Sequence, residues 1–195
     1  MLRGLEQIPV VYDSFMWVSE KLGLLGWRRW LAGGALGRTL EVGCGTGRNL
    51  SHYGSGSRVV AVEPDRAALD AARRRAPGVP LAVARVEDLP FRAETFDTAV
   101  SSLVFCSVPD PVRGLREVRR VLRPLGTLRM MEHVRSRHPL GARFQDAVQP
   151  VWTWVTGGCH PNRDTEANVA AAGFVIDRST RRAARALRRF VARPH

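Results

Sequence analysis

Lysine is almost absent from this sequence. The 195 residues contain one lysine, Lys21, although lysine and arginine together number 30. Because a P-loop needs a lysine directly after its last glycine, a phosphate-binding loop of that type is excluded. The formal net charge of +12 would attract nucleic acid, anionic lipid or acidic substrates. The arginines are scattered, however, and cluster only at 73–75 and 181–189, so a dedicated nucleic-acid or membrane surface is not favoured.

Cysteine and long apolar runs are also scarce. The three cysteines, Cys44, Cys106 and Cys159, are too few and too widely spaced for a disulfide framework or a CxxC-type zinc site. We therefore expect a reducing, cytoplasmic location and no metal. No run approaches the roughly 18 apolar residues of a membrane-spanning helix. The N-terminus also lacks the apolar stretch of a secretion signal.

Short runs rich in strand-forming residues alternate with helical patterns along most of the chain. The predicted strands are 38–42, 57–62, 80–84, 96–101, 125–131 and 173–178. The predicted helices are 10–31, 47–53, 65–75 and 111–122, followed by a longer helical segment at 140–171. This alternation predicts an α/β fold with a parallel sheet covered on both faces. In such folds the ligand lies beyond the carboxyl ends of the strands.

The stretch TLEVGCGTGRNL, residues 39–50, ends the first predicted strand in three glycines, Gly43, Gly45 and Gly47. A dinucleotide site needs G-x-G-x-x-G, and Arg48 stands where the third glycine belongs. We therefore expect a ligand that lies against this loop without a pyrophosphate. Glu41, inside the strand, is suited to bind an amine-bearing ligand or to fix N–H groups of the loop.

Acids follow the next two predicted strands as well. Glu63 ends the second strand, roughly 20 residues beyond the first glycines, where an acid is placed to accept both hydroxyls of a ribose. The segment VEDLPF, residues 86–91, follows the third strand and offers an acid and backbone N–H groups to the edge of an adenine ring. The three features together predict a site for an adenosine-containing ligand.

The residues that carry these features resemble class I S-adenosylmethionine-dependent methyltransferases. The matching segments, in order, are EVGCGTG (41–47), VEP (62–64), EDLPF (87–91), FD (96–97) and EVRRVLRPLG (117–126). The resemblance covers most of the chain. It implies a Rossmann-like α/β fold with a mostly parallel seven-stranded sheet, helices on both faces and an antiparallel last strand near 185–192. It also implies S-adenosylmethionine as the cofactor and methyl transfer as the activity.

The same resemblance, with the loop residues above, defines the expected cofactor site. Its members are Tyr12, Glu41, Gly43, Cys44, Gly45, Gly47, Asn49, Glu63, Pro64, Val86, Glu87, Ser102 and Leu103. The glycine loop is expected at the methionine end of the cofactor and Glu63 at its ribose. Val86 and Glu87 are expected at the adenine, with Ser102 and Leu103 under the cofactor. Tyr12 is a candidate cover.

Three later segments indicate one branch of the class. SSLVFCSVPDP (101–111), MEHV (131–134) and GGCHPNRDT (157–165) resemble bacterial small-molecule methyltransferases and animal membrane-associated thiol methyltransferases. We therefore expect a small-molecule acceptor, with a thiol as the leading candidate. His133, just after a predicted strand, is the candidate catalytic base or orienting residue.

Two alternatives to a thiol methyltransferase stay open. One is methylation of a quinone precursor or a lipid headgroup, because that branch shares segments such as DLPF. The other is a basic nucleic-acid-binding protein that retains the cofactor fold. For organisation we expect a single domain over 1–195. Its parts are an N-terminal helical lid (1–35), a cofactor-binding core (36–134) and acceptor-side helices with the last strands (135–195).

Overall fold

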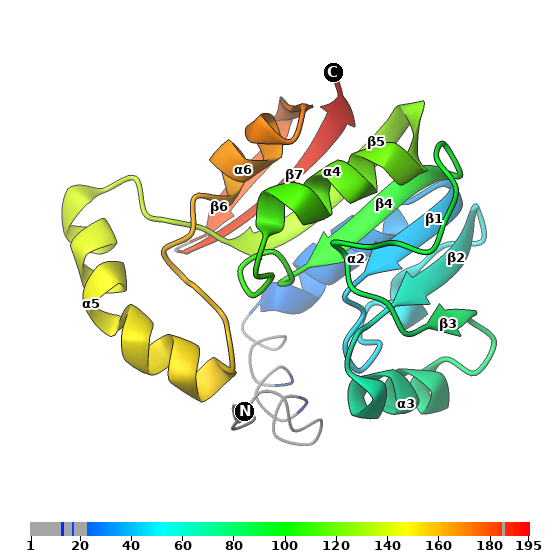
Figure 1. The fold of residues 1–195 in the computed structure, drawn as a ribbon, viewed down its shortest axis with the longest axis horizontal. Helices are drawn as coiled ribbons and strands as arrows, with labels where there is room; N and C mark the ends of the chain where they lie inside the picture. Colours follow the sequence, from blue (N-terminus) through cyan, green and yellow to red (C-terminus); the bar gives the residue numbers. More distant parts are fainter. Residues whose placement is uncertain (1–12, 14–16, 18–22, 185) are drawn as a thin grey trace.

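The computed structural model describes Asp13, Trp17, residues 23–184 and residues 186–195. Most of the expected N-terminal lid, including Tyr12, lies outside the described residues. A seven-stranded sheet organises the described part, with the strand order β3-β2-β1-β4-β5-β7-β6 (Figure 1). Every helix in this part is too short or too polar to cross a membrane.

The first five strands are parallel and the last is antiparallel to both of its neighbours. The strands are β1 (Gly37–Val42), β2 (Ser57–Val62), β3 (Leu81–Ala82), β4 (Phe96–Ser102), β5 (Leu122–His133), β6 (Phe174–Ala184) and β7 (Leu187–Pro194). The six predicted strands and the antiparallel seventh are confirmed. The structure extends β5 and β6 beyond the predicted ranges and reduces the third strand to two residues.

The helices are α2 (Leu25–Gly33), the 3-10 helix η3 (Leu50–His52), α3 (Arg66–Arg75), α4 (Pro111–Val121), α5 (Pro139–Thr156) and α6 (Thr165–Ala171). The predicted helix at 47–53 is wrong, because the left-handed φ of Gly47, 82°, leaves room only for η3. The predicted segment 140–171 is two helices. Gly157 and Gly158 both have positive φ and end α5, and Asp164 caps the start of α6.

Alternating side chains divide the core between the two faces of the sheet. On one face, Leu40 and Val42 of β1 pack with Leu115 and Val118 of α4. On the other face, Val100 of β4 packs under α2, and separate contacts hold α3 against β2. Figure 1 shows α4 and α6 on the near face, α2 behind the sheet and α5 standing to one side. The result is a three-layer α/β fold.

The order of strands reverses between β1 and β4, which are neighbours in the sheet. Chain connections leave β1 toward one edge of the sheet and β4 toward the other. In open parallel sheets this switch point leaves a crevice beyond the carboxyl ends of the strands. The glycine loop after β1 and the segment after β4 therefore face each other across the place where a ligand is expected.

Candidate functional site

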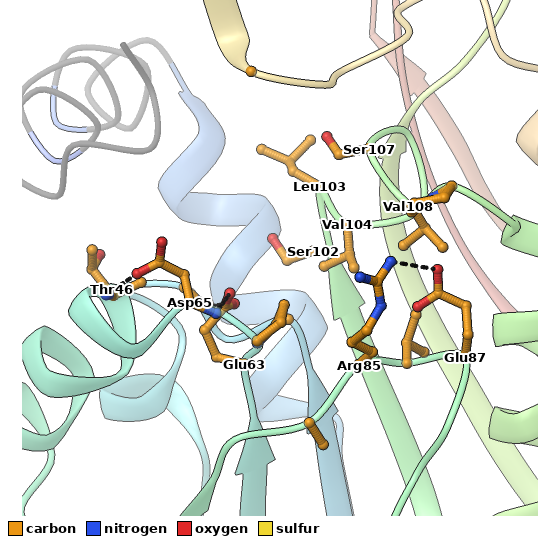
Figure 2. A pocket seen from close by; sticks show the side chains of 18 of the residues that line it. Thr46, Glu63, Asp65, Arg85, Glu87, Ser102, Leu103, Val104, Ser107 and Val108 are labelled. Atoms are coloured by element: carbon orange, nitrogen blue, oxygen red, sulfur yellow. Dashed lines mark hydrogen bonds and ion pairs between the residues drawn. The ribbon is translucent and has the colours of Figure 1, made fainter. Parts of the chain in front are cut away.

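A cavity of about 490 Å³ lies at this switch point. Its lining comes from the loops after β1, β2, β3 and β4 and from the end of α5 (Figure 2). Predicted cofactor residues in the lining are Gly43, Gly45, Glu63, Pro64, Val86, Glu87, Ser102 and Leu103. The structure thus brings together residues from four separate loops. The cavity has room for a nucleoside-sized ligand.

The glycines of the first loop have left-handed backbones, with φ of 62° at Gly43 and 53° at Gly45. A Cβ on Gly43 would lie 2.5 Å from Val104 Cγ2, so β1 and the segment after β4 approach each other too closely for a side chain. A Cβ on Gly45 would meet no described atom within 4 Å. Gly43 therefore serves the packing of the loops, whereas Gly45 keeps the cavity open.

This difference predicts separate effects for two matched substitutions. Gly43→Ala should lower the free energy of unfolding by about 3 kcal/mol, because the left-handed strain adds to overpacking against Val104. Gly45→Ala should cost only about 1–2 kcal/mol, the strain alone. Urea unfolding of both variants measures this. Equal losses in the two variants would contradict the assignment of the contact with Val104 to Gly43 alone.

Glu63 directly follows β2, and its carboxylate accepts hydrogen bonds from two backbone amides. Oε2 accepts a hydrogen bond from Gly45 N–H at 2.9 Å, and Oε1 accepts one from Asp65 N–H at 3.0 Å. Burial raises the pKa of Glu63, and these two amides act against that shift. Each carboxylate oxygen has a second lone pair, so both can also accept a hydroxyl from a ligand in the cavity. Two adjacent hydroxyls are what a ribose presents.

The third loop forms the end of the cavity beyond Glu63. Val86 is buried and lines the cavity as an apolar surface, suited to one face of an aromatic ring. Arg85 and Glu87 point toward each other in Figure 2, with Arg85 Nη2 3.5 Å from Glu87 Oε1. Arg85 is exposed, and its guanidinium adds hydrogen-bond donors at this end of the cavity. These groups are suited to stack against an aromatic ring and to bind its edge.

Glu41 and Asn49 belong to a buried network behind the loop and not to the cavity lining. Glu41 accepts hydrogen bonds from Asn49 Nδ2 at 2.8 Å and from Tyr53 Oη at 2.9 Å. Arg28, which is 2% exposed, donates to Asn49 Oδ1 at 2.7 Å and to Ser102 Oγ at 3.3 Å. The network links α2, β1, η3 and β4 under the site. The sequence left two roles open for Glu41: binding an amine-bearing ligand or fixing the glycine loop. Its hydrogen bonds to Asn49 and Tyr53 favour the second role.

The buried position of Glu41 predicts a pH-dependent stability. Burial raises its pKa from 4.5 to about 7, against hydrogen bonds from Asn49 and Tyr53 and the nearby charge of Arg28. Between these values the unfolded chain is ionised while the folded chain keeps the proton. The free energy of unfolding should therefore fall by about 3 kcal/mol as the pH rises from 4.5 through 7.

Glu41→Gln removes this titration and keeps a side chain of the same size. The free energy of unfolding of the variant, measured in urea between pH 4.5 and pH 8, should not show the fall attributed to Glu41. The Tyr53 hydroxyl can rotate to accept the new amide proton, so the network retains its partners. If the free energy of unfolding changed with pH in the same way in both proteins, the pKa of Glu41 would not be raised in the folded chain.

Glu132, near the end of β5, anchors the segment after β4 and was not predicted. It is fully buried, and its Oε1 accepts hydrogen bonds from Val104 N–H at 2.9 Å and Phe105 N–H at 3.1 Å. The Ser101 hydroxyl donates to the same oxygen, and Cys106 N–H donates to Oε2 at 3.4 Å. The carboxylate thereby fixes the backbone on the β4 side of the cavity. Its only signal in the sequence is an acid at the end of an apolar run.

Two further residues with distant partners, Asp13 and Arg28, were also missed. Asp13 accepts hydrogen bonds from Thr46 Oγ1 at 2.7 Å and Arg75 Nη2 at 2.6 Å, and so contacts both the glycine loop and α3. Arg28 holds Asn49, as described above. The patterns around Asp13 and Arg28 are ordinary helical ones, because the partners lie far away in the sequence. Only the folded chain identifies them.

His133, the candidate catalytic residue, lies beside two cysteines. Its Nδ1 is 3.6 Å from Cys159 Sγ, and its ring meets Trp152 edge-on with 6.4 Å between centroids. Cys106 completes the group, with one ligand atom of each residue within 4.8 Å of the others. A hydrogen bond from the Cys106 thiol, with His133 nearby, lowers the pKa of Cys159, whereas that of Cys106 is raised.

The other predicted residues fall into two groups. Cys44 and Gly47 lie in the glycine loop but outside the cavity lining. Cys44 is buried, and burial raises the pKa of its thiol far above the usual range, so it is not a nucleophile. Gly47 packs so closely against Ala72 of α3 that a Cβ on Gly47 would lie 3.0 Å from Ala72. Tyr12 lies outside the described residues.

Comparisons with known proteins agree with this geometry. A family model described as a methyltransferase domain matches residues 40–130. The chain is 36% identical over 151 residues to the human thiol S-methyltransferase TMT1B, covering 72% of this chain. It is 35% identical over 145 residues to TMT1B of Rattus norvegicus, covering 69% of this chain. These matches span 62% and 59% of the two relatives' lengths.

Solved structures share the fold at low sequence identity. A methyltransferase from Thermotoga maritima aligns over 98% of this chain and 99% of its own, with a TM-score of 0.74 and 21% identity. The sheet order, the switch-point cavity and the matched family model agree on one class: residues 40–130 form a methyltransferase domain, in a fold of the kind found in class I S-adenosylmethionine-dependent methyltransferases. Among the curated proteins the chain is similar to the thiol S-methyltransferases named above.

Proposed function

We propose that this protein binds S-adenosylmethionine in the switch-point cavity and transfers its methyl group to a small thiol. The observation that carries the proposal is the Glu63 carboxylate, which is held by Gly45 N–H and still has lone pairs for two ribose hydroxyls. In this arrangement the glycine loop receives the methionine part. Val86 and Glu87 receive the adenine, and Ser102 and Leu103 lie beneath the cofactor.

Methyl transfer from a sulfonium is an in-line displacement on an activated carbon, so the protein contributes mainly orientation. A thiol with a pKa near its usual value of about 8.5 needs little help to react as its thiolate. The acceptor enters from the side of Ser107, Thr156 and Gly157, which also line the cavity. His133, close behind this wall, orients or deprotonates the acceptor. Similarity to thiol S-methyltransferases supports a thiol as the substrate class.

Two measurements test this function. Calorimetry should show binding of S-adenosylhomocysteine, the product that fills the same cavity. Transfer of a labelled methyl group should then be strongest to thiols in a panel that also holds phenols, amines and quinone precursors. Absence of S-adenosylhomocysteine binding would overturn the whole proposal. Transfer to a quinone precursor or a lipid amine in preference to thiols would replace the acceptor and keep the donor.

The organisation and location are proposed on separate grounds. We propose that residues 36–134 form the cofactor-binding core and 135–195 the acceptor side of one domain, with residues 1–35 over the site. The contact of Asp13 with Thr46 and Arg75 supports the last part, since it ties that segment to the glycine loop. A cytoplasmic location is supported by the three cysteines, which are all free.

A further inference from the structure

A cluster of two thiols and an imidazole lies behind the acceptor side of the cavity. Its members are Cys106 after β4, His133 at the end of β5 and Cys159 after α5. Cys106 and Cys159 are 1% and 4% exposed, and His133 is half-buried. Thiolate sulfur and imidazole nitrogen are the ligands that Zn²⁺ prefers. Nothing in the sequence spacing predicted this group, because its members lie on three distant segments.

The separation of the side chains suits a tetrahedral metal ion. Zinc binds sulfur at about 2.3 Å and nitrogen at about 2.0–2.1 Å, so two ligands of one tetrahedral ion lie about 3.5–3.8 Å apart. Cys159 Sγ and His133 Nδ1 are 3.6 Å apart, and the ligand atoms of all three residues lie within 4.8 Å of one another.

The backbone around the cluster is held in place by hydrogen bonds. Glu132 accepts from Cys106 N–H, and the Cys106 carbonyl accepts from His160 N–H at 2.9 Å. Cys159 N–H donates to Thr156 Oγ1 at 3.2 Å, and its carbonyl accepts from Thr153 Oγ1 at 2.9 Å. A preformed set of ligands binds a metal ion without a large cost of ordering.

Charge also favours a divalent ion at this place. Two thiolates and a neutral imidazole balance Zn²⁺, so the loaded site is neutral and its burial costs little. Within the described residues the group has three members, one fewer than a closed structural zinc site requires. Three protein ligands with one open position are typical of catalytic zinc, and Cys₂His is one of the known sets.

The cluster adjoins the cavity through its neighbours in the chain. Ser107 (Figure 2), next to Cys106, lines the cavity. Gly157, two residues before Cys159, lines it as well. We infer that Cys106, His133 and Cys159 bind Zn²⁺ or a similar borderline-soft divalent cation, and that a thiol acceptor occupies its fourth position as the thiolate. The second part of this inference rests on the proposed function.

The chemistry then balances without a change of oxidation state. The acceptor thiol loses its proton to solvent when its sulfur joins the metal. A sulfur lone pair attacks the methyl carbon, and the bond from that carbon to the sulfonium breaks with its electron pair staying on the cofactor sulfur. The products are a thioether and S-adenosylhomocysteine. His133 acts in this scheme as a ligand that positions the acceptor, which is the orienting alternative stated above.

Cobalt binding tests the metal site without any assay of activity. The metal-free chain, kept reduced with a phosphine so that no thiol is added, should bind one Co²⁺ per chain with the near-ultraviolet absorption of thiolate-to-cobalt charge transfer. Cys106→Ser and Cys159→Ser should each weaken binding more than about 100-fold, beyond the usual effect of losing an outer-shell partner. Cys44→Ser is the matched control and should bind as the unaltered chain does.

Thermal unfolding of the metal-free variants shows whether each serine variant is folded. Should one be unfolded, Cys106→Ala or Cys159→Ala replaces it in the same titration. Substoichiometric cobalt binding by the folded parent chain, or binding unaltered in both cluster variants, would overturn the site.

The fourth position is tested by adding 2-mercaptoethanol to the cobalt-loaded protein. We expect a saturable increase in the charge-transfer absorption as a further thiolate joins the metal. An unchanged spectrum, or thiol methylation with the same kcat/KM in the metal-free enzyme, would overturn the acceptor role. Metal binding without any thiol methylation would instead count against the proposed acceptor, and thiol methylation without metal binding would count against this inference alone.

Discussion

Glu63→Ala is expected to weaken S-adenosylhomocysteine binding by about 10²- to 10⁴-fold. The substitution removes hydrogen bonds from two ribose hydroxyls to a carboxylate, each worth about 1.5–3 kcal/mol, and about 1.4 kcal/mol corresponds to a factor of ten in affinity. It also releases the N–H groups of Gly45 and Asp65, which shape the loop beside the ligand. Isothermal titration calorimetry measures the change directly.

Two further variants separate the ribose contact from a general loss of structure. Glu63→Gln keeps one acceptor oxygen and should bind about 10-fold more weakly than the parent. Asp70→Asn removes an exposed carboxylate on α3 whose described partner is Arg73, and it should leave the affinity unchanged. An affinity within a factor of three of the parent in Glu63→Ala, with the same thermal stability, would show that the ribose binds elsewhere.

Glu132→Ala is expected to give the largest loss of stability, about 4–6 kcal/mol. The change leaves the partly buried N–H group of Val104 and the buried N–H group of Phe105 without their acceptor, and each such group costs about 1–3 kcal/mol. The lost packing of a fully buried side chain adds to this. In urea the unfolding midpoint should fall by about 2 M or more.

Ser101→Ala is the matched control for this effect. It removes a single hydroxyl donor from Glu132 and leaves the carboxylate satisfied by backbone amides, so it should cost about 1 kcal/mol. Glu132→Gln, which keeps one acceptor, should fall between the two. A loss of less than 1 kcal/mol in Glu132→Ala would mean that water replaces the carboxylate, and the segment after β4 would not depend on it.

Features that depend on neighbours in the chain were predicted well. Short apolar runs with flanking turn residues predicted the strands β1, β2 and β4. The glycine loop follows from the need for left-handed backbone, which Gly43 and Gly45 adopt. Glu63 was located by its distance from that loop along a βαβ unit. Errors came where a local pattern was interrupted, as at Gly47, which stops the helix predicted for 47–53.

The residues predicted for the cofactor site likewise include some that line the cavity and some that do not. Residues at strand ends, such as Glu63 and Glu87, line the cavity because parallel strands bring their carboxyl ends to one edge of the sheet. Glu41 was placed in the site as an acid inside the strand that could bind an amine-bearing ligand, yet it accepts hydrogen bonds from Asn49 and Tyr53 and is not part of the cavity lining. One residue along a strand reverses the face, so position alone does not fix the direction.

The sequence by itself therefore determined the fold class, the glycine loop and the position of Glu63 beside that loop, because each depends on residues close together in the chain. The tertiary structure alone decided three contacts: the burial of Glu41 beside Tyr53, the hold of Glu132 on the segment after β4, and the meeting of His133 with two cysteines. Each joins segments that only packing brings together. The partner of such a side chain depends on how whole helices and strands pack against one another. Residues nearby in the sequence do not reveal that packing.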